Sequence, residues 1–203
     1  MKKIILASSS PRRSELLKQL GLSFTVYKID VEEEIEEKNP ENLAERLAFS
    51  KAEAVAKLIG CGVVIGADTI VSVDGCILGK PQDRNEAAKM LNLLSGRTHM
   101  VLTGLAVIVQ PGFYVQTHVE RTFVRMRDLK QDEIEWYLNC DEPYDKAGGY
   151  GIQGKAAVFI DRLEGCYYNV VGLPLAALWR LLDKAGVCVC KGADDIGFKA
   201  PDH

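Results

Sequence analysis

Two kinds of hydrophobic pattern follow one another along this chain. Runs rich in apolar and β-branched residues predict strands, because such residues fit a pleated and buried surface. We place these strands at residues 4–7, 23–29, 62–73, 99–110 and 113–126. Stretches with apolar residues three or four positions apart predict amphipathic helices. These helices begin near Pro11, Pro40, Arg84, Glu133 and Pro174.

The order of these elements indicates the fold class. Strands and helices alternate early in the chain, and two long strands then meet at a hairpin near Pro111. This order predicts an α/β fold around a mixed sheet, with two lobes and a central cleft as the expected ligand site. No repeat or linker forces a boundary. We therefore assign residues 1–190 to a single domain and residues 191–203 to a polar C-terminal tail.

Three local expectations follow from the same pattern. The polar residues Asp68 and Thr69 are expected to break the strand at 62–73. The helix that begins near Pro40 is expected to include Leu58. Two further strands are expected to meet at a turn around Gly165.

Composition and charge narrow the classes of protein. The 203 residues are 47% hydrophobic and 26% charged, as in ordinary globular domains, and the formal net charge is -3. The acidic balance disfavours nucleic acid as a partner. No apolar run reaches the roughly 20 residues that cross a bilayer, and the start turns polar too early for a signal peptide. We therefore expect a cytoplasmic protein with no membrane partner.

The segment from Ser8 to Arg13 has the groups that hold a phosphate. Its sequence is SSSPRR, in which Pro11 is expected to begin a helix and Ser10 to cap it. Hydroxyl groups, backbone amides of a helix start and two guanidinium groups can all bind an anion. Basic side chains in a first turn oppose the helix dipole, which favours an anion site over a solvated helix start.

One carboxylate, Asp68, stands in an otherwise apolar strand and needs a partner. Lys80 could return beside it across the hairpin at Asp74, or it could be an edge lysine that discourages sheet pairing. Glu32 belongs to a run of three glutamates, which is either a solvated face or a second source of oxygen ligands. Together Asp68 and Glu32 could hold Mg²⁺ or Mn²⁺ with the help of substrate phosphates.

A glycine-rich segment at residues 148–154 is the other unusual feature, with four glycines among seven residues. So many glycines indicate sharp bends or a close approach of the backbone to a ligand. Gln153 carries both a donor and an acceptor, which suits the imide edge of a uracil-type base. Tyr150 could pack against the ring of such a base.

Six motifs stand in order along the chain. They are ASSSPRR at 7–13, GADT at 66–69, GKP at 79–81, SGRTH at 95–99, EPYDKAG at 142–148 and VGLP at 171–174. In this order and spacing, the chain closely resembles the Maf family of nucleoside triphosphate pyrophosphatases from about residue 4 to residue 186. The resemblance implies an elongated α/β fold of the Maf and ITPase type, and it implies a homodimer.

The resemblance also implies a reaction. Members hydrolyse the bond between the α- and β-phosphates of a nucleotide, which gives the monophosphate and pyrophosphate, and they require a divalent cation. Asp68 matches the aspartate that activates water, although a role as metal ligand is chemically as reasonable. Glu32 matches the metal-associated glutamate. The residues that match positions around the triphosphate are Ser8, Arg12, Arg13, Lys51 and Lys80.

Three residues match family positions that are associated with the choice of base. The chain is similar to the family branch that acts on dTTP and UTP at Arg12, Thr69 and Gln153, which favours a house-cleaning hydrolase of pyrimidine and modified pyrimidine nucleotides. A nucleotide-binding regulator of septum formation and cell division is the alternative, because binding needs the same basic residues. Nucleic-acid binding through Arg12 and Arg13 is a third reading, which the net charge disfavours.

Overall fold

The computed structural model describes residues 3–29, 37–187 and 189. The chain forms two compact units, and each unit is assembled from separate segments. The first unit holds the described residues within 1–68, 103–120 and 172–203, and the second holds residues 69–102 and 121–171.

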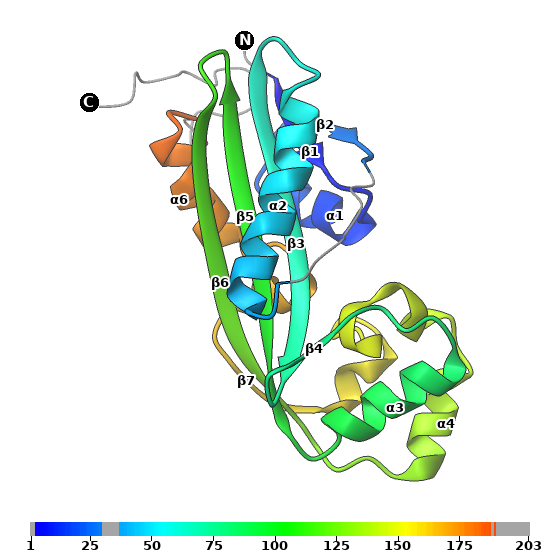
Figure 1. Cartoon of the computed structure of the whole chain (residues 1–203). Helices are drawn as coiled ribbons and strands as arrows, with labels where there is room; N and C mark the ends of the chain where they lie inside the picture. The colour runs from blue at the N-terminus through cyan, green and yellow to red at the C-terminus, as the bar shows by residue number, and fades with distance from the viewer. Residues whose placement is uncertain (1–2, 30–36, 188, 190–203) are drawn as a thin grey trace. The chain divides into compact units, whose positions relative to one another are not determined.

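Among the described residues, seven strands form one mixed sheet in the order β2-β1-β3-β5-β6-β7, with β4 paired to β3 (Figure 1). The strands are β1 (Ile4–Ala7), β2 (Phe24–Tyr27), β3 (Gly62–Val73), β4 (Cys76–Leu78), β5 (Thr98–Gln110), β6 (Tyr114–Met126) and β7 (Ile160–Glu164). Strand β1 runs parallel to β2 and to β3, whereas β4 is antiparallel to β3 and β7 is antiparallel to β6. The α/β class and the mixed sheet are therefore confirmed.

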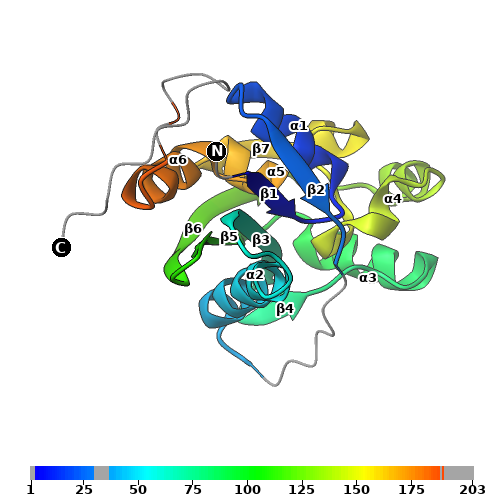
Figure 2. The ribbon, with the colours of Figure 1, turned by 90° about the horizontal axis from the view of Figure 1, so that it is seen from above.

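The helices cover this sheet within each unit. They are α1 (Pro11–Gln19), α2 (Pro40–Ala56), α3 (Arg84–Leu94), α4 (Gln131–Leu138), α5 (Tyr167–Val171) and α6 (Leu175–Lys184), and three 3-10 segments are η1 (Glu142–Asp145), η2 (Ala147–Gly149) and η3 (Lys155–Phe159). In the first unit, α2 lies on one face of the sheet and α1 and α6 lie on the other (Figure 2). In the second unit, α3 and α4 lie side by side.

Local signals in the sequence set two of the helix starts. The side chain of Asn39 accepts hydrogen bonds from the backbone amides of Glu41 and Asn42, at 2.9 and 3.3 Å, and so caps α2. The side chain of Asp83 accepts from the amide of Glu86 at 2.8 Å and caps α3. These caps satisfy amides that have no partner inside the helix.

The expected break at Asp68 and the expected end of the second helix are both wrong. Strand β3 continues through Asp68 without interruption, because the carboxylate has an ion-pair partner and the backbone need not leave the sheet. Helix α2 ends at Ala56, so Leu58 lies beyond it and is 63% exposed. Leu58 follows Val55 by three positions, so it continues the apolar spacing of the helix although the helix has already ended.

The expectation of two strands around Gly165 is also only half right. Strand β7 ends at Glu164, but the chain after Gly165 forms the short helix α5. Its fully buried Asn169 donates a hydrogen bond to the carbonyl oxygen of Val101, at 3.0 Å. This tertiary bond holds a segment whose aromatic and β-branched residues locally favour a strand.

Two predictions lie outside this description. The predicted tail at residues 191–203 and the predicted metal ligand Glu32 both belong to the residues that the structure does not describe. Among the residues it does describe, no helix combines the length and the apolar character needed to cross a membrane.

Candidate active site

A close contact between α2 and β3 places Lys51 beside Asp68 in the first unit. A Cβ atom on Gly66 would lie 2.8 Å from the Cβ of Ala52 and still closer to the carbonyl oxygen of Ala48. The missing side chain therefore lets the helix backbone rest against the strand. Because side chains alternate along a strand, Asp68 faces the same side of β3 as Gly66, and that is the side covered by α2.

Lys51 and Asp68 form an ion pair between Nζ and Oδ1. The two side chains are 15% and 13% exposed, so both charges are largely removed from water. A charge in such a place must be paired, and each residue supplies the partner that the other needs. Both residues were predicted as site residues from the sequence, but their pairing was not.

Arg13 connects the loop after β1 to the segment before α6. Its Nε donates a hydrogen bond to the carbonyl oxygen of Gly172 at 2.8 Å, and its Nη1 donates to the Oγ of Ser8 at 3.3 Å. The same Oγ accepts a hydrogen bond from the backbone amide of Ser10 at 3.2 Å. Ser8 is buried, so this small network fixes the position of the Arg13 guanidinium.

The pKa of Arg13 reflects its burial and its charged neighbours. Burial lowers this pKa from its usual range, the charge of Asp68 offsets part of the decrease, and the charge of Arg12 adds to it. Arg13 is therefore within electrostatic reach of both residues. The first unit thus brings together five of the predicted site residues, which are Ser8, Arg12, Arg13, Lys51 and Asp68.

The start of α1 differs in one respect from the prediction. Ser10 occupies the N-cap position, but its side chain makes no capping hydrogen bond, and the first turn contains no acidic residue. Two arginines stand there instead, where they oppose the helix dipole. A negatively charged ligand would relieve both the missing cap and this repulsion.

The other predicted site residues that the structure describes belong to the second unit. Thr69 is half-buried on β3, and Lys80 and Gln153 are exposed. The pairing of β3 with β4 ends at Val71 and Leu78, two residues before Lys80. The predicted return of Lys80 to Asp68 therefore stays a prediction, because the ladder that should bring it back stops short.

The glycine-rich segment corrects the expectation for Tyr150. This residue is 5% exposed, and its hydroxyl lies 2.6 Å from the Nε2 of His99. Burial lowers the pKa of His99 to about 4, so the imidazole is neutral at neutral pH. Tyr150 is part of the core of the second unit, where its ring packs at 86° to the ring of His99.

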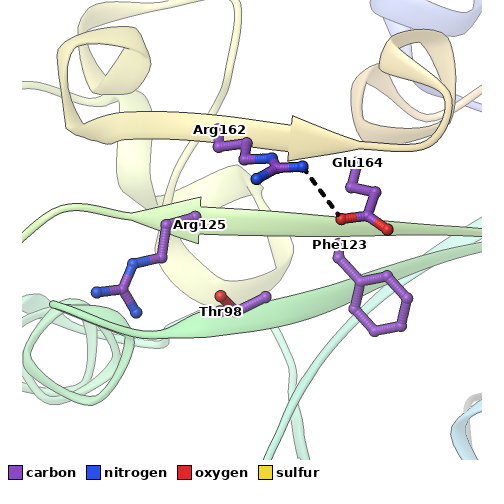
Figure 3. A pocket seen from close by; sticks show the side chains of 5 residues that line it. All are labelled: Thr98, Phe123, Arg125, Arg162 and Glu164. Carbon is purple, nitrogen blue, oxygen red and sulfur yellow. Dashed lines mark ion pairs between the residues drawn. The ribbon is translucent and has the colours of Figure 1, made fainter.

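A separate hollow lies on the open face of β5, β6 and β7 in the second unit (Figure 3). It measures about 220 Å³ and is lined by Thr98, Phe123, Arg125, Arg162 and Glu164. None of the predicted site residues lines it. An ion pair of 3.7 Å joins Arg162 to Glu164 across its rim.

The donor set around Asp68 partly fits a divalent cation. Among the residues within 3–29, 37–187 and 189, no group of three acidic, histidine or cysteine side chains could hold a metal. Mg²⁺, however, usually takes one or two carboxylates and completes its coordination with water and substrate phosphates. Asp68 supplies one carboxylate near the cationic groups of Lys51 and Arg13, which fits this mode.

The comparisons with known proteins agree with one another. The family model described as Maf-like protein matches residues 3–185, so the chain belongs to the Maf family. A protein of Acetivibrio thermocellus named "dTTP/UTP pyrophosphatase" is 50% identical over 199 residues, covering 94% of this chain and 99% of its own. A protein of Desulforamulus reducens with the same name is 52% identical over 189 residues, covering 92% and 98%.

One solved structure is also similar. It is the Ham1 protein of Staphylococcus aureus, with a TM-score of 0.46 and 20% identity over 64% of this chain and 74% of that chain. A likeness of this size carries no argument about the fold or the function. The fold class stands on the strands and helices described above.

Proposed function

We propose that this chain is a nucleoside triphosphate pyrophosphatase that hydrolyses dTTP, UTP and modified pyrimidine nucleotides to the monophosphate and pyrophosphate. The observation that carries the proposal is the group of cationic side chains near Asp68. The chain belongs to the Maf family, and relatives with 50% and 52% sequence identity are named dTTP/UTP pyrophosphatase. A house-cleaning role follows from hydrolysis of nucleotides that would otherwise enter nucleic acid.

The cations act on the phosphate tail. Ser8, Arg12, Arg13, Lys51 and Lys80 bind the triphosphate and neutralise the charge that builds up on the leaving pyrophosphate. In phosphoryl transfer, positioning and electrostatic stabilisation supply most of the lowering of the barrier. The hydrogen bonds from Arg13 to Ser8 and Gly172 support this role, because a guanidinium held in place loses little freedom when it binds.

Asp68 acts where water attacks the phosphorus atom. It either accepts the proton of the attacking water or holds the divalent cation together with Glu32. Bound Mg²⁺ or Mn²⁺ would supply positive charge and acidify a water molecule. The ion pair with Lys51 supports both roles, because it holds the carboxylate in a fixed position in the first unit.

Base choice belongs to Arg12, Thr69 and Gln153. The exposed amide of Gln153 can donate one hydrogen bond and accept another, which matches the imide edge of thymine and uracil. A site built to hydrogen-bond a base rejects a base that leaves these groups unpaired. Guanine presents the opposite arrangement of donors and acceptors at part of its edge.

Assembly and location are the remaining parts of the proposal. The active form is a homodimer in the cytoplasm. Light scattering of the purified chain across a range of concentrations tests the dimer, and a mass equal to one chain at all concentrations would contradict it.

A product assay tests the function directly. The full chain is incubated with dTTP, UTP, CTP and GTP in the presence of Mg²⁺ or Mn²⁺, and the products are separated. We expect pyrophosphate from dTTP and UTP, whereas release of orthophosphate would contradict the assigned bond. Asp68→Asn should lose turnover and still bind nucleotide, and the exposed Asp74→Asn serves as the control. Nucleotide binding without turnover in the unaltered chain would favour the regulator of cell division.

A further inference from the structure

A single acidic side chain, Glu142, holds the turn that carries Gln153. Its Oε1 accepts a hydrogen bond from the hydroxyl of Tyr137 at 3.0 Å, and its Oε2 accepts one from the backbone amide of Lys155 at 2.9 Å. The Tyr137 hydroxyl in turn accepts a hydrogen bond from the amide of Gly151 at 3.3 Å. Glu142 is therefore connected to both ends of the segment 151–155, and all of these residues lie in the second unit.

Gly151 and Gly154 let the backbone of this turn lie against the side chains of Lys146 and Glu142. A Cβ atom on Gly154 would overlap the carboxylate of Glu142, and one on Gly151 would lie 2.6 Å from the Cε of Lys146. The Nζ of Lys146 donates to the backbone carbonyl oxygen of Glu142 at 2.7 Å. The amide of Gly154 closes the turn by donating to the carbonyl oxygen of Gly151 at 3.1 Å. A side chain at either position would have to displace the end of the Lys146 or the Glu142 side chain.

Tyr137 remains a hydrogen-bond donor to this carboxylate. Burial, and then the charge of Glu142, raise the pKa of the Tyr137 hydroxyl well above its usual value, so the group stays protonated. The ring of Tyr137 is fully buried and packs edge-on against Phe159, with centroids 5.4 Å apart. Glu142 is thus anchored to the core at one oxygen and to the turn at the other.

Gln153 itself is exposed while the backbone around it is held. A binding group on a fixed backbone presents its donor and acceptor in one direction, which lowers the cost of binding and sharpens discrimination. The same amide on a loose glycine turn would reach several bases about equally well. The rigidity of the turn is therefore the property that a base-selecting glutamine needs.

We propose that Glu142 is a positioning residue for base selection, which holds the turn 151–154 so that the Gln153 amide meets the pyrimidine edge in one orientation. The inference rests on the proposed function, because it takes Gln153 as the residue that contacts the base. Glu142 itself touches no part of the substrate in this proposal.

The test compares base selectivity with stability. Glu142→Ala should narrow the ratio of kcat/KM for dTTP over CTP by about tenfold to a hundredfold, the loss that a misplacement of about 1 Å can cause. The change in kcat/KM should come mainly from KM and not from kcat, because the residues proposed to bind the phosphates are not altered. Glu142→Gln keeps one hydrogen-bond acceptor in its side chain. Its ratio of kcat/KM for dTTP over CTP should therefore lie between that of the unaltered chain and that of Glu142→Ala.

Glu133 offers a matched control. It also accepts a backbone hydrogen bond, from the amide of Lys130 at 2.9 Å, and it forms an ion pair with Arg127, but neither of these partners belongs to the turn. Glu133→Ala should lower the unfolding temperature and leave the base ratio unchanged. An unchanged base ratio in Glu142→Ala, with an unfolding temperature lowered as in Glu133→Ala, would reduce Glu142 to a structural role and overturn the proposal.

Two further variants separate the inference from the function on which it rests. If Gln153→Ala leaves the base ratio unchanged, the assignment of Gln153 fails. If Gln153→Ala narrows the ratio and Glu142→Ala does not, only the positioning role fails. Gly154→Ala places a methyl group where the Glu142 carboxylate lies, so it should push this carboxylate out of its hydrogen bonds and also lower the ratio. Should Glu142→Ala not fold, an unchanged base ratio in Gly154→Ala overturns the proposal.

Discussion

The contact between α2 and β3 makes Gly66→Ala the most informative single substitution. The added methyl group would lie 2.8 and 2.9 Å from the Cβ and backbone nitrogen of Ala52, whereas carbon atoms in ordinary contact are about 3.5 to 4.0 Å apart. The closest neighbours include helix backbone, which cannot rotate away as a side chain could. The helix must therefore retreat from the strand by about 1 Å.

The size of the effect follows from this forced movement. Overpacking a well-packed core costs about 1–3 kcal/mol, and contact with backbone places Gly66→Ala near 3 kcal/mol. For a protein of this length, a loss of 1 kcal/mol lowers the unfolding temperature by about 2–4 °C. We therefore expect a decrease of about 6–12 °C. Turnover should also fall, about a hundredfold, because Lys51 on α2 moves relative to Asp68.

Differential scanning calorimetry and the pyrophosphate assay measure the two effects. Gly60→Ala is the control, since Gly60 lies in the same unit and a Cβ there would have no atom within 4 Å. That variant should keep both its unfolding temperature and its activity. If Gly66→Ala unfolds at the original temperature and keeps full turnover, then the close approach of α2 does not position Lys51.

Three further predictions follow from other parts of the structure. Gly172 has a φ of 116°, so Gly172→Ala should strain the backbone and move the carbonyl oxygen that accepts a hydrogen bond from Arg13. The KM for dTTP should then rise about tenfold, and an unchanged KM would contradict the role of this hydrogen bond in positioning Arg13. The lowered pKa of His99, about 4 against an ordinary 6.5, means that the folded chain binds fewer protons than the unfolded chain between these values. Stability should thus fall as the pH drops from 8 to 5, by about 2 kcal/mol more than in His99→Gln, as measured by urea unfolding. Arg125 faces Arg162 directly across β6 and β7, so Arg125→Thr should raise the free energy of unfolding by about 0.2–1 kcal/mol without changing turnover, and a loss of stability would show that this like-charge pair is compensated.

Much of the fold could be predicted because local signals and tertiary packing agree. Strand β1 has the predicted bounds, and α2 and α3 begin at Pro40 and Arg84, where the helix starts were predicted. The errors occur where a distant partner decides. The ion pair of Asp68 keeps β3 continuous, and the buried Asn169 holds a helix where the local residues favour a strand.

The site was predicted less completely than the fold, for a related reason. Residue types and motifs pointed to Ser8, Arg13, Lys51 and Asp68, but no pattern showed which of them touch. The signal for the Lys51–Asp68 pair was present in Gly66, since a glycine inside a buried strand indicates a close approach by another backbone. The carbonyl of Gly172 could not be found in this way, because every residue has a carbonyl and only the fold shows which one meets Arg13.

The balance of charge in the first unit connects this geometry to the chemistry. Lys51 is paired with Asp68, Arg13 lies within electrostatic reach of Asp68, and Arg12 lies within reach of Arg13. These four side chains carry three positive charges and one negative charge, which leaves an excess of two positive charges. Such an excess attracts a polyphosphate, yet the carboxylate stays close enough to weaken that attraction. An acidic group that opposes substrate binding is kept only if it contributes more in the transition state than it costs in the ground state. Loss of turnover with retained or tighter nucleotide binding in Asp68→Asn is therefore what this arrangement of charges requires.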